Sequence, residues 1–374
     1  MKFCMILESF SPNSKNGGNF RCCELSKNLV KLGHDVDIIS MKSEDNDAEH
    51  EVLNGVHIYR IGPKMKQSEN IVKYTVLNYV KSILLWIRKH DYDIIDIQSR
   101  SSSIYTTLVS KLSHTPVIGT VYELNNDDTE TFNNFVNKVS IKKYDKVLTT
   151  NESTKNELVN KYDVNPDKIA LMSIGVNLNN IDKIKCKTKN HDRILYVGTL
   201  TAYKNIDHLL TIICHLKEVQ PGIKLVIIGD GPEKEHLEEI IRTNNIQNHV
   251  EFIDNVSQKE LIYQMKLANL LVLPSTHEKF GILSTTANAC YTPTIAYKSK
   301  GIKEVIKDKE TGYLVKPENI EELEEKIRYV LENDDVNKTL RRQAREYIES
   351  KNNWDDITLS YINMASKLVN CSKL

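Results

Sequence analysis

Short apolar runs rich in β-branched residues alternate with longer segments of helical periodicity along almost the whole chain. Strands that are apolar on both faces fit the interior of a parallel sheet, and the intervening segments must then supply helices that cover it. The strand candidates fall into two series. The first comprises residues 3–7, 36–40, 57–61, 93–97, 117–121 and 146–149, and the second comprises residues 193–197, 224–228, 250–252, 270–273, 294–296 and 313–315. We therefore expect an α/β protein with two doubly wound parallel sheets.

Residues 177–192 separate the two series; they are rich in Asn and Lys, poor in apolar side chains, and the best linker candidate. We expect a first domain at residues 1–176 and a second at residues 193–345. A length of 374 residues agrees with two domains of ordinary size. The last segment has helical periodicity and is more apolar than a free tail requires. We expect residues 346–374 to form a helix that packs back on the first domain.

Composition excludes several classes of protein. The 50 basic and 50 acidic residues leave no net charge, which argues against a nucleic-acid binder. The seven cysteines are scattered without a CxxC pair, as in a cytoplasmic protein with reduced thiols. No apolar stretch approaches the roughly 20 residues that cross a bilayer, and the apolar run at the N-terminus is too short for a signal peptide. We expect a cytoplasmic protein whose partner is small or locally recognised.

Ligands of open α/β sheets bind beyond the carboxyl ends of the strands, against helix N-termini. Gly17 and Gly18 follow the first strand of the first series, and Gly198 follows the first strand of the second. The latter loop brings Lys204 to a helix N-terminus, where a cation suits stabilisation of a diphosphate leaving group. A flexible loop and a solvated lysine are the alternatives. The turn at residues 229–232 lacks the GxGxxG spacing and does not support a nicotinamide site.

The most informative loop follows the strand at residues 270–273. It contains Glu278, and a Phe-Gly pair then leads into a helix whose first-turn amides are unpaired. A carboxylate beside a phosphate site must bind something other than phosphate. Sugar hydroxyls donate well to a carboxylate, so this loop indicates a site for a sugar attached to phosphate.

The stretch L-P-S-T-H-E-K-F-G-I-L-S-T-T at residues 273–286 resembles the signature loop of the retaining family 4 glycosyltransferases, group 1 type, of the GT-B fold. Other family motifs follow in the same order along residues 1–330. They are the paired glycines 17–18, G-H-D-V at 33–36, V-G-T-L at 197–200 with its lysine at 204, G-D-G-P at 229–232, G-I-K-E-V-I at 301–306 and T-G-Y-L-V at 311–315. The resemblance implies two Rossmann-like domains with an inter-domain cleft, the first for the acceptor and the second for the donor nucleotide.

The resemblance also implies roles for single residues. Glu278 would contact the donor sugar, and Lys204 would be the lysine of the cleft; these two are the catalytic candidates. The donor-binding candidates are Gly17, Gly18, Gly198, Thr199, Lys204, Asn255, Val256, Glu278, Phe280, Gly281, Ile282 and Thr286. The acceptor-binding candidates, at strand ends of the first domain, are Arg100, Tyr122 and Glu123. A basic Arg100 would suit an acidic or phosphate-bearing acceptor, with a solvated arginine as the alternative.

Three positions depart from the family pattern. Thr286 stands where the second Glu of E-x7-E is usual, Thr199 where an arginine is frequent, and Tyr122 where a histidine is frequent. A neutral hydrogen bond from Thr286 to ribose is worth about 1 kcal/mol less than a charge-assisted one. Lys204 is then the main counter-charge for the diphosphate. In the family the departing phosphate helps to deprotonate the acceptor, so positioning and backbone amides can sustain catalysis.

We therefore expect a retaining glycosyltransferase that moves a sugar from a nucleotide-diphosphate sugar to a glycan or lipid-linked acceptor. We expect no metal, because a helix N-terminus and a lysine take its place. The three substitutions leave open an inactive homologue that acts as a binding or partner subunit. A sugar-nucleotide epimerase is a further alternative, although no clear acid and base pair is found. The basic, amphipathic helix at residues 71–89 suits peripheral contact with an anionic membrane, and a helix that only covers the sheet is its alternative.

Overall fold

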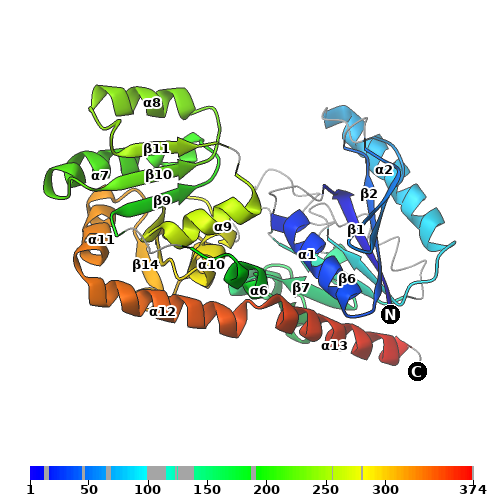
Figure 1. The fold of residues 1–374 in the computed structure, drawn as a ribbon. Coiled ribbons are helices and arrows are strands. Elements are labelled where there is room, and N and C mark those ends of the chain that lie inside the picture. Colours follow the sequence, from blue (N-terminus) through cyan, green and yellow to red (C-terminus); the bar gives the residue numbers. More distant parts are fainter. Residues whose placement is uncertain are drawn as a thin grey trace. The chain divides into compact units, whose positions relative to one another are not determined.

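The computed structural model describes residues 1–11, 17–43, 47–64, 69–98, 115–122, 124, 139–186, 191–254, 256–278 and 281–372, with backbone only at 69–77. The chain divides into two compact units (Figure 1). The first unit joins Met1–Ile174 to the C-terminal segment Trp354–Leu374, and the second is Gly175–Asn353. Each unit has its own α/β architecture.

The first unit contains a sheet with the strand order β3-β4-β2-β1-β5-β6-β7-β8. Its strands are β1 (Lys2–Ser9), β2 (Asp35–Met41), β3 (His50–Leu53), β4 (Val56–Arg60), β5 (Ile94–Ile97), β6 (Val117–Val121), β7 (Lys146–Thr149) and β8 (Ile169–Leu171). The neighbouring strands are parallel, apart from the β3–β4 hairpin. Its helices in the described residues are α1 (Gly17–Lys31), α2 (Glu69–Ile87), α5 (Glu152–Asn160) and α13 (Trp354–Ser372), with a 3-10 turn at Pro166–Lys168. Helical periodicity also predicts a helix near residues 102–112, and these residues lie outside the described part of the chain.

The last helix, α13, is part of the first unit although it follows the second along the chain. One face of α13 is buried, and it includes Trp354, Tyr361 and Ala365. The Tyr361 ring lies 5.8 Å from that of Phe3 on the central strand β1. Full burial of such large rings stabilises by about 2 kcal/mol each, so α13 is an integral part of this unit's core.

The second unit has an all-parallel sheet with the order β11-β10-β9-β12-β13-β14. Its strands are β9 (Arg193–Val197), β10 (Lys224–Ile228), β11 (Val250–Ile253), β12 (Leu270–Leu273), β13 (Thr294–Tyr297) and β14 (Gly312–Val315). Its helices are α6 (Leu178–Lys183), α7 (Ile206–Val219), α8 (Lys234–Thr243), α9 (Gln258–Leu267), α10 (Ile282–Ala289), α11 (Ile320–Glu332) and α12 (Asp334–Lys351), with 3-10 turns η2 (Ala202–Lys204) and η3 (Ile302–Glu304). The sheet strands are buried among these helices in one apolar core.

The strand orders identify where each sheet can bind a ligand. In the second unit, β10 and β11 follow β9 on one side of it, and the chain then crosses to place β12 on the other side of β9. In the first unit, β1 separates β2 from β5 in the same way. Loops after the strands at such a reversal diverge, and open α/β sheets bind ligands there. The relevant loops follow β9 and β12 in the second unit, and β1 and β5 in the first.

The unit boundaries differ from those expected from the sequence. The proposed linker contains helix α6, whose Ile181 is buried, and Asp182 accepts two hydrogen bonds from Arg345, at 2.7 and 2.8 Å. Residues 177–192 have the polar composition of a linker because α6 buries little more than one side chain. The boundary at residue 345 falls inside α12, where Ile348 is buried in the second unit's core. That unit therefore extends to Asn353.

Candidate active site

The loops after β9 and β10 approach each other closely at the switch point of the second sheet. Gly229 has a φ of +152°, and a Cβ atom there would lie 1.8 Å from the carbonyl oxygen of Gly198. Leu200 then donates its N–H to the carbonyl of Asp230 at 3.0 Å. Only glycine permits this approach, so the G-D-G-P turn fixes the path of the loop that carries Lys204.

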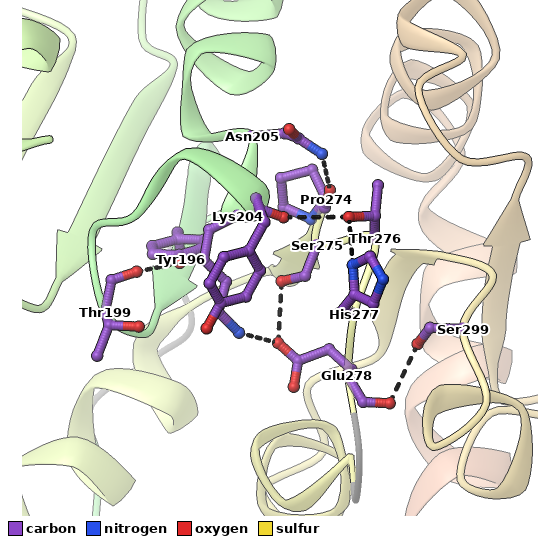
Figure 2. A network of polar contacts seen from close by, with 11 residues as sticks. Tyr196, Thr199, Lys204, Asn205, Pro274, Ser275, Thr276, His277, Glu278 and Ser299 are labelled. Atoms are coloured by element: carbon purple, nitrogen blue, oxygen red, sulfur yellow. Dashed lines mark hydrogen bonds and ion pairs between the residues drawn. The ribbon is translucent and has the colours of Figure 1, made fainter. Parts of the chain in front are cut away.

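Lys204 and Glu278 form an ion pair across the two switch-point loops (Figure 2). Lys204 ends the turn η2, just before α7, and Glu278 lies four residues before α10. The Lys204 Nζ and the hydroxyl of Ser275, at 2.9 Å, both donate to Oε1 of Glu278. Within the described part of the chain no donor reaches Oε2. The two side chains are only 11% and 16% exposed, so the pair is largely desolvated and strongly coupled.

Backbone contacts hold this pair in place. Asn205 caps α7 in a left-handed conformation, φ +48°, and its Nδ2 donates to the carbonyl of Pro274 at 3.0 Å. The N–H of Thr276 donates to the carbonyl of Tyr203 at 3.3 Å. From the other side, the N–H of Gly301 donates to the carbonyl of Glu278 at 2.9 Å. Backbone carbonyls of both loops therefore hold the charged residues in place; Figure 2 shows the contacts of Asn205 with Pro274 and of Ser299 with the Glu278 carbonyl.

Tyr196 on β9 is near enough to the pair to interact electrostatically with Glu278. Its hydroxyl donates to the carbonyl of Thr199 at 3.2 Å. Burial, together with the negative charge of Glu278, raises the pKa of Tyr196 well above its usual value. The phenol therefore remains neutral and ties the start of the loop to β9. Thr199 itself is exposed, and it supplies only this backbone carbonyl to the contacts shown in Figure 2.

The N-terminus of α10 is the third part of the site. Gly281 caps it with φ +61°, and a Cβ there would lie 2.8 Å from Cγ2 of Val305. The free N–H groups of the first turn, which begins at Ile282, form a ready anion site. Thr286 donates its hydroxyl to the carbonyl of Ile282 at 2.8 Å. Its proton is used within the helix, so only lone pairs remain for a ligand.

The remaining donor candidates contribute less. Val256 is half-buried and packs against the unit's core. Asn255 and Phe280 lie outside the described residues. Two contributors were not expected from the sequence: Ser275, which the short spacing to Glu278 could have indicated, and Tyr196, for which a buried strand position gives no signal.

In the first unit, the structure brings Tyr122 and the paired glycines together. Gly17 and Gly18 are the first residues of α1, and Tyr122 follows β6. A Cβ at Gly18 would lie 3.2 Å from the Tyr122 ring, so glycine lets the ring cover the start of the helix. The Tyr122 hydroxyl lies 2.8 Å from Oε1 of Gln98 and 3.4 Å from the carbonyl of Gly18. Arg100 and Glu123 lie outside the described residues.

Comparisons with known proteins identify the family. Residues 179–347 match the family model described as glycosyl transferases group 1, and residues 15–180 match the model of glycosyltransferase family 4. The chain belongs to the group 1 glycosyltransferases. A protein of Methanocaldococcus jannaschii named as an uncharacterized glycosyltransferase is 26% identical over 97% of both chains. The D-inositol 3-phosphate glycosyltransferase of Corynebacterium diphtheriae is 25% identical over 84% of this chain and 83% of that protein.

Solved structures show the fold. Sucrose-phosphate synthase from Thermosynechococcus elongatus superimposes with a TM-score of 0.82, at 21% identity and 99% coverage of both chains. The Anabaena protein HepE, solved in complex with UDP, gives 0.78 at 14% identity, with 98% of this chain and 100% of that chain covered. This glycosyltransferase therefore has the GT-B fold.

Two searches of the described residues complete the picture. None of the helices found there combines the length and the apolar character that a bilayer crossing requires. Among the same residues, no group of three or more His, Cys, Asp or Glu side chains is arranged to hold a metal ion.

Proposed function

We propose that this glycosyltransferase moves a sugar from a nucleotide-diphosphate sugar to a glycan or lipid-linked acceptor, with retention of the anomeric configuration. The observation that carries the proposal is the Lys204–Glu278 pair, held beside the N-termini of α7 and α10 at the switch point of the second sheet. Structures of HepE with UDP and with UDP-glucose support a nucleotide-sugar donor.

The proposed roles follow from the chemistry of these groups. The diphosphate binds to the free amides of Gly281 and Ile282 and to the ammonium of Lys204, which together offset its charge. Oε2 of Glu278 accepts a hydrogen bond from a sugar hydroxyl, while Oε1 keeps Lys204 oriented. A carboxylate so close to the phosphate is tolerated because Lys204 neutralises it.

The transfer then needs no side-chain nucleophile. The acceptor oxygen forms a bond to the anomeric carbon on the face from which the phosphate leaves. The electron pair of the broken bond stays on the phosphate oxygen, and the acceptor proton passes to that phosphate. Lys204 and the amides stabilise the charge that develops there. No step calls for a metal ion, so we propose that turnover persists after chelation with EDTA.

A second candidate function is a partner subunit that binds a nucleotide sugar without turning it over. It is favoured by Thr286, whose hydroxyl proton is already donated to Ile282, so that ribose is offered at most one neutral acceptor. Thermal shift measurements with UDP, GDP, ADP and CMP sugars, followed by turnover of any sugar that binds, separate the candidates. Binding with hydrolysis or transfer supports the enzyme, and epimerised donor indicates an epimerase. Binding without turnover favours the partner subunit, while no binding contradicts all three.

We also propose a cytoplasmic protein that contacts the inner face of the membrane through α2. Lys81 and Leu85 are exposed one turn apart on that helix, and Arg88 and Lys89 are exposed in the turn that follows its end at Ile87. The purified protein should co-sediment with vesicles of anionic lipid at low salt and less at high salt. Absence of binding at low salt would contradict membrane contact and leave the transferase proposal intact.

A further inference from the structure

A buried polar network lies under the first unit's switch point. Its centre is Asp96 on β5, which is fully buried. The carboxylate accepts three hydrogen bonds: Tyr361 Oη to Oδ2 at 2.8 Å, Gln98 Nε2 to Oδ2 at 3.3 Å, and Thr120 Oγ1 to Oδ1 at 3.1 Å. These three donors offset part of the cost of removing the carboxyl group from water.

The charge of Asp96 is balanced from α1. Arg21, one turn into that helix, is fully buried and attracts the carboxylate electrostatically. Burial raises the pKa of Asp96, and Arg21 and the hydrogen bond from Tyr361 oppose that rise. The network thus depends on groups from α1, α13 and the central strands together.

The network extends to the candidate site through Gln98. A carboxylate can only accept, so the end of the Gln98 amide that faces Asp96 must be the NH2 group. The other end, Oε1, then faces Tyr122 and accepts its hydroxyl at 2.8 Å. The Tyr122 ring in turn covers Gly18 at the start of α1. An unbroken chain of contacts therefore joins the last helix of the protein to the glycine-led start of α1.

We propose that Tyr361 of α13 is a positioning residue of the active site, acting through Asp96 and Gln98 to hold Tyr122 over the start of α1. This inference rests on the proposed function and on the roles expected from the sequence for Gly18 in donor binding and Tyr122 in acceptor binding. Tyr361 makes the shortest of the three hydrogen bonds to Asp96. Without it, Oδ2 keeps only Gln98, whose amide is free to move toward the carboxylate and away from Tyr122.

The test compares two variants on α13. Tyr361→Phe keeps the ring in the core and removes only the hydroxyl. Thr358→Val is the matched control, because it removes a buried hydroxyl one turn away whose partner among the described residues is the helix's own Trp354 carbonyl, at 2.7 Å. The protein is labelled with 3-fluorotyrosine at its 17 tyrosines, and the 19F signal of Tyr122 is assigned by its loss in Tyr122→Phe. We expect this signal to shift in Tyr361→Phe and to stay unchanged in Thr358→Val.

Gln98→Met provides a second route to the same result. It should displace the Tyr122 signal as Tyr361→Phe does, and the double variant should add nothing further, since both act along one path. An unmoved Tyr122 signal in folded Tyr361→Phe overturns the proposal. If that variant does not fold, an unmoved signal in Gln98→Met overturns it instead.

Turnover of UDP-glucose gives the functional readout. We expect kcat to fall about tenfold in Tyr361→Phe, as for loss of one buried hydrogen bond, and to stay within about twofold in Thr358→Val. KM for the donor should change little, because the groups proposed to bind its diphosphate, Lys204, Gly281 and Ile282, lie in the second unit. An unchanged kcat with a shifted Tyr122 signal would also overturn the positioning role. If the unaltered protein turns over no sugar nucleotide, the proposed function fails, and the Tyr122 signal still reports separately on the link to α13.

Discussion

The Lys204–Glu278 pair predicts a specific separation of stability from activity. Glu278→Gln and Lys204→Met each leave one largely buried charge without its partner. Such a loss costs about 3–5 kcal/mol in a fully buried pair. Because the two side chains remain 11% and 16% exposed, we expect removal of either partner to cost less, about 2–3 kcal/mol. The double variant removes both charges and should recover most of that loss.

Calorimetry of the full chain measures this cycle. In a unit of this size, 1 kcal/mol corresponds to about 2–4 °C in Tm, so we expect each single variant to lower the second unit's transition by about 5–10 °C. The double variant should melt within about 3 °C of the unaltered protein. Turnover should nevertheless fall at least about tenfold in all three variants, because the phosphate and sugar contacts are not restored.

An exposed pair in the same unit provides the control. Lys234 Nζ lies 2.7 Å from Oδ1 of Asp254, and these side chains are 26% and 57% exposed, more than those of Lys204 and Glu278. The same cycle with Lys234→Met and Asp254→Asn should change Tm and turnover little, since surface ion pairs are screened. Additive losses in Lys204→Met and Glu278→Gln would refute the coupling. Full activity in either single variant would remove these residues from the site.

Three further outcomes are expected. Gly281→Ala should destabilise the second unit by about 1–3 kcal/mol in urea unfolding, because the residue has a left-handed φ and a Cβ atom there would contact Val305. Adding Val305→Ala should recover only the steric part of this loss. An unchanged stability in Gly281→Ala would contradict the cap geometry. Thr286→Glu should tighten UDP binding in calorimetric titration, because a carboxylate accepts both ribose hydroxyls; an unchanged Kd counts against placing ribose there. Burial raises the pKa of several thiols and phenols, so the folded state keeps protons that the unfolded chain releases. The contribution of these groups to the free energy of unfolding is complete below their pKa values in the unfolded chain, near 8.5 for thiols and 10 for phenols. It is lost as the pH rises above those values. A free energy of unfolding that stays constant from pH 7 to 10.5 would contradict this prediction. The groups are Cys4, Cys22, Tyr196 and Tyr361.

The strands were largely predictable because a strand buried on both faces shows as a continuous apolar run. The exceptions have physical reasons. β3, H-E-V-L, is an edge strand that alternates between exposed and half-buried residues, and β8 has only three residues. Helical periodicity continues through residue 345, and no local signal marks Asn353 as the end of the second unit. The polar composition of residues 177–192 predicted a linker where the structure has α6.

The site was predictable residue by residue but not as a set of contacts. Motifs indicated Lys204 and Glu278 separately, yet these lie 74 residues apart and meet only because β9 and β12 are neighbours in the sheet. The hydrogen bond from the Thr286 hydroxyl to the Ile282 carbonyl depends on the side-chain rotamer of Thr286, which the motif does not specify. Tyr361 and Asp96 are 265 residues apart, and no local pattern connects them.

The most direct test of the central claim is the fate of the sugar when nucleotide sugars are offered to the protein and to Lys204→Met. Proton NMR follows donor consumption and the configuration of the first product. We expect the protein to consume one donor of the panel with retention of the anomeric configuration, as α-glucose from UDP-glucose would show. Lys204→Met should be slower by at least about tenfold. An inverted product, or equal rates for the two proteins, would contradict it.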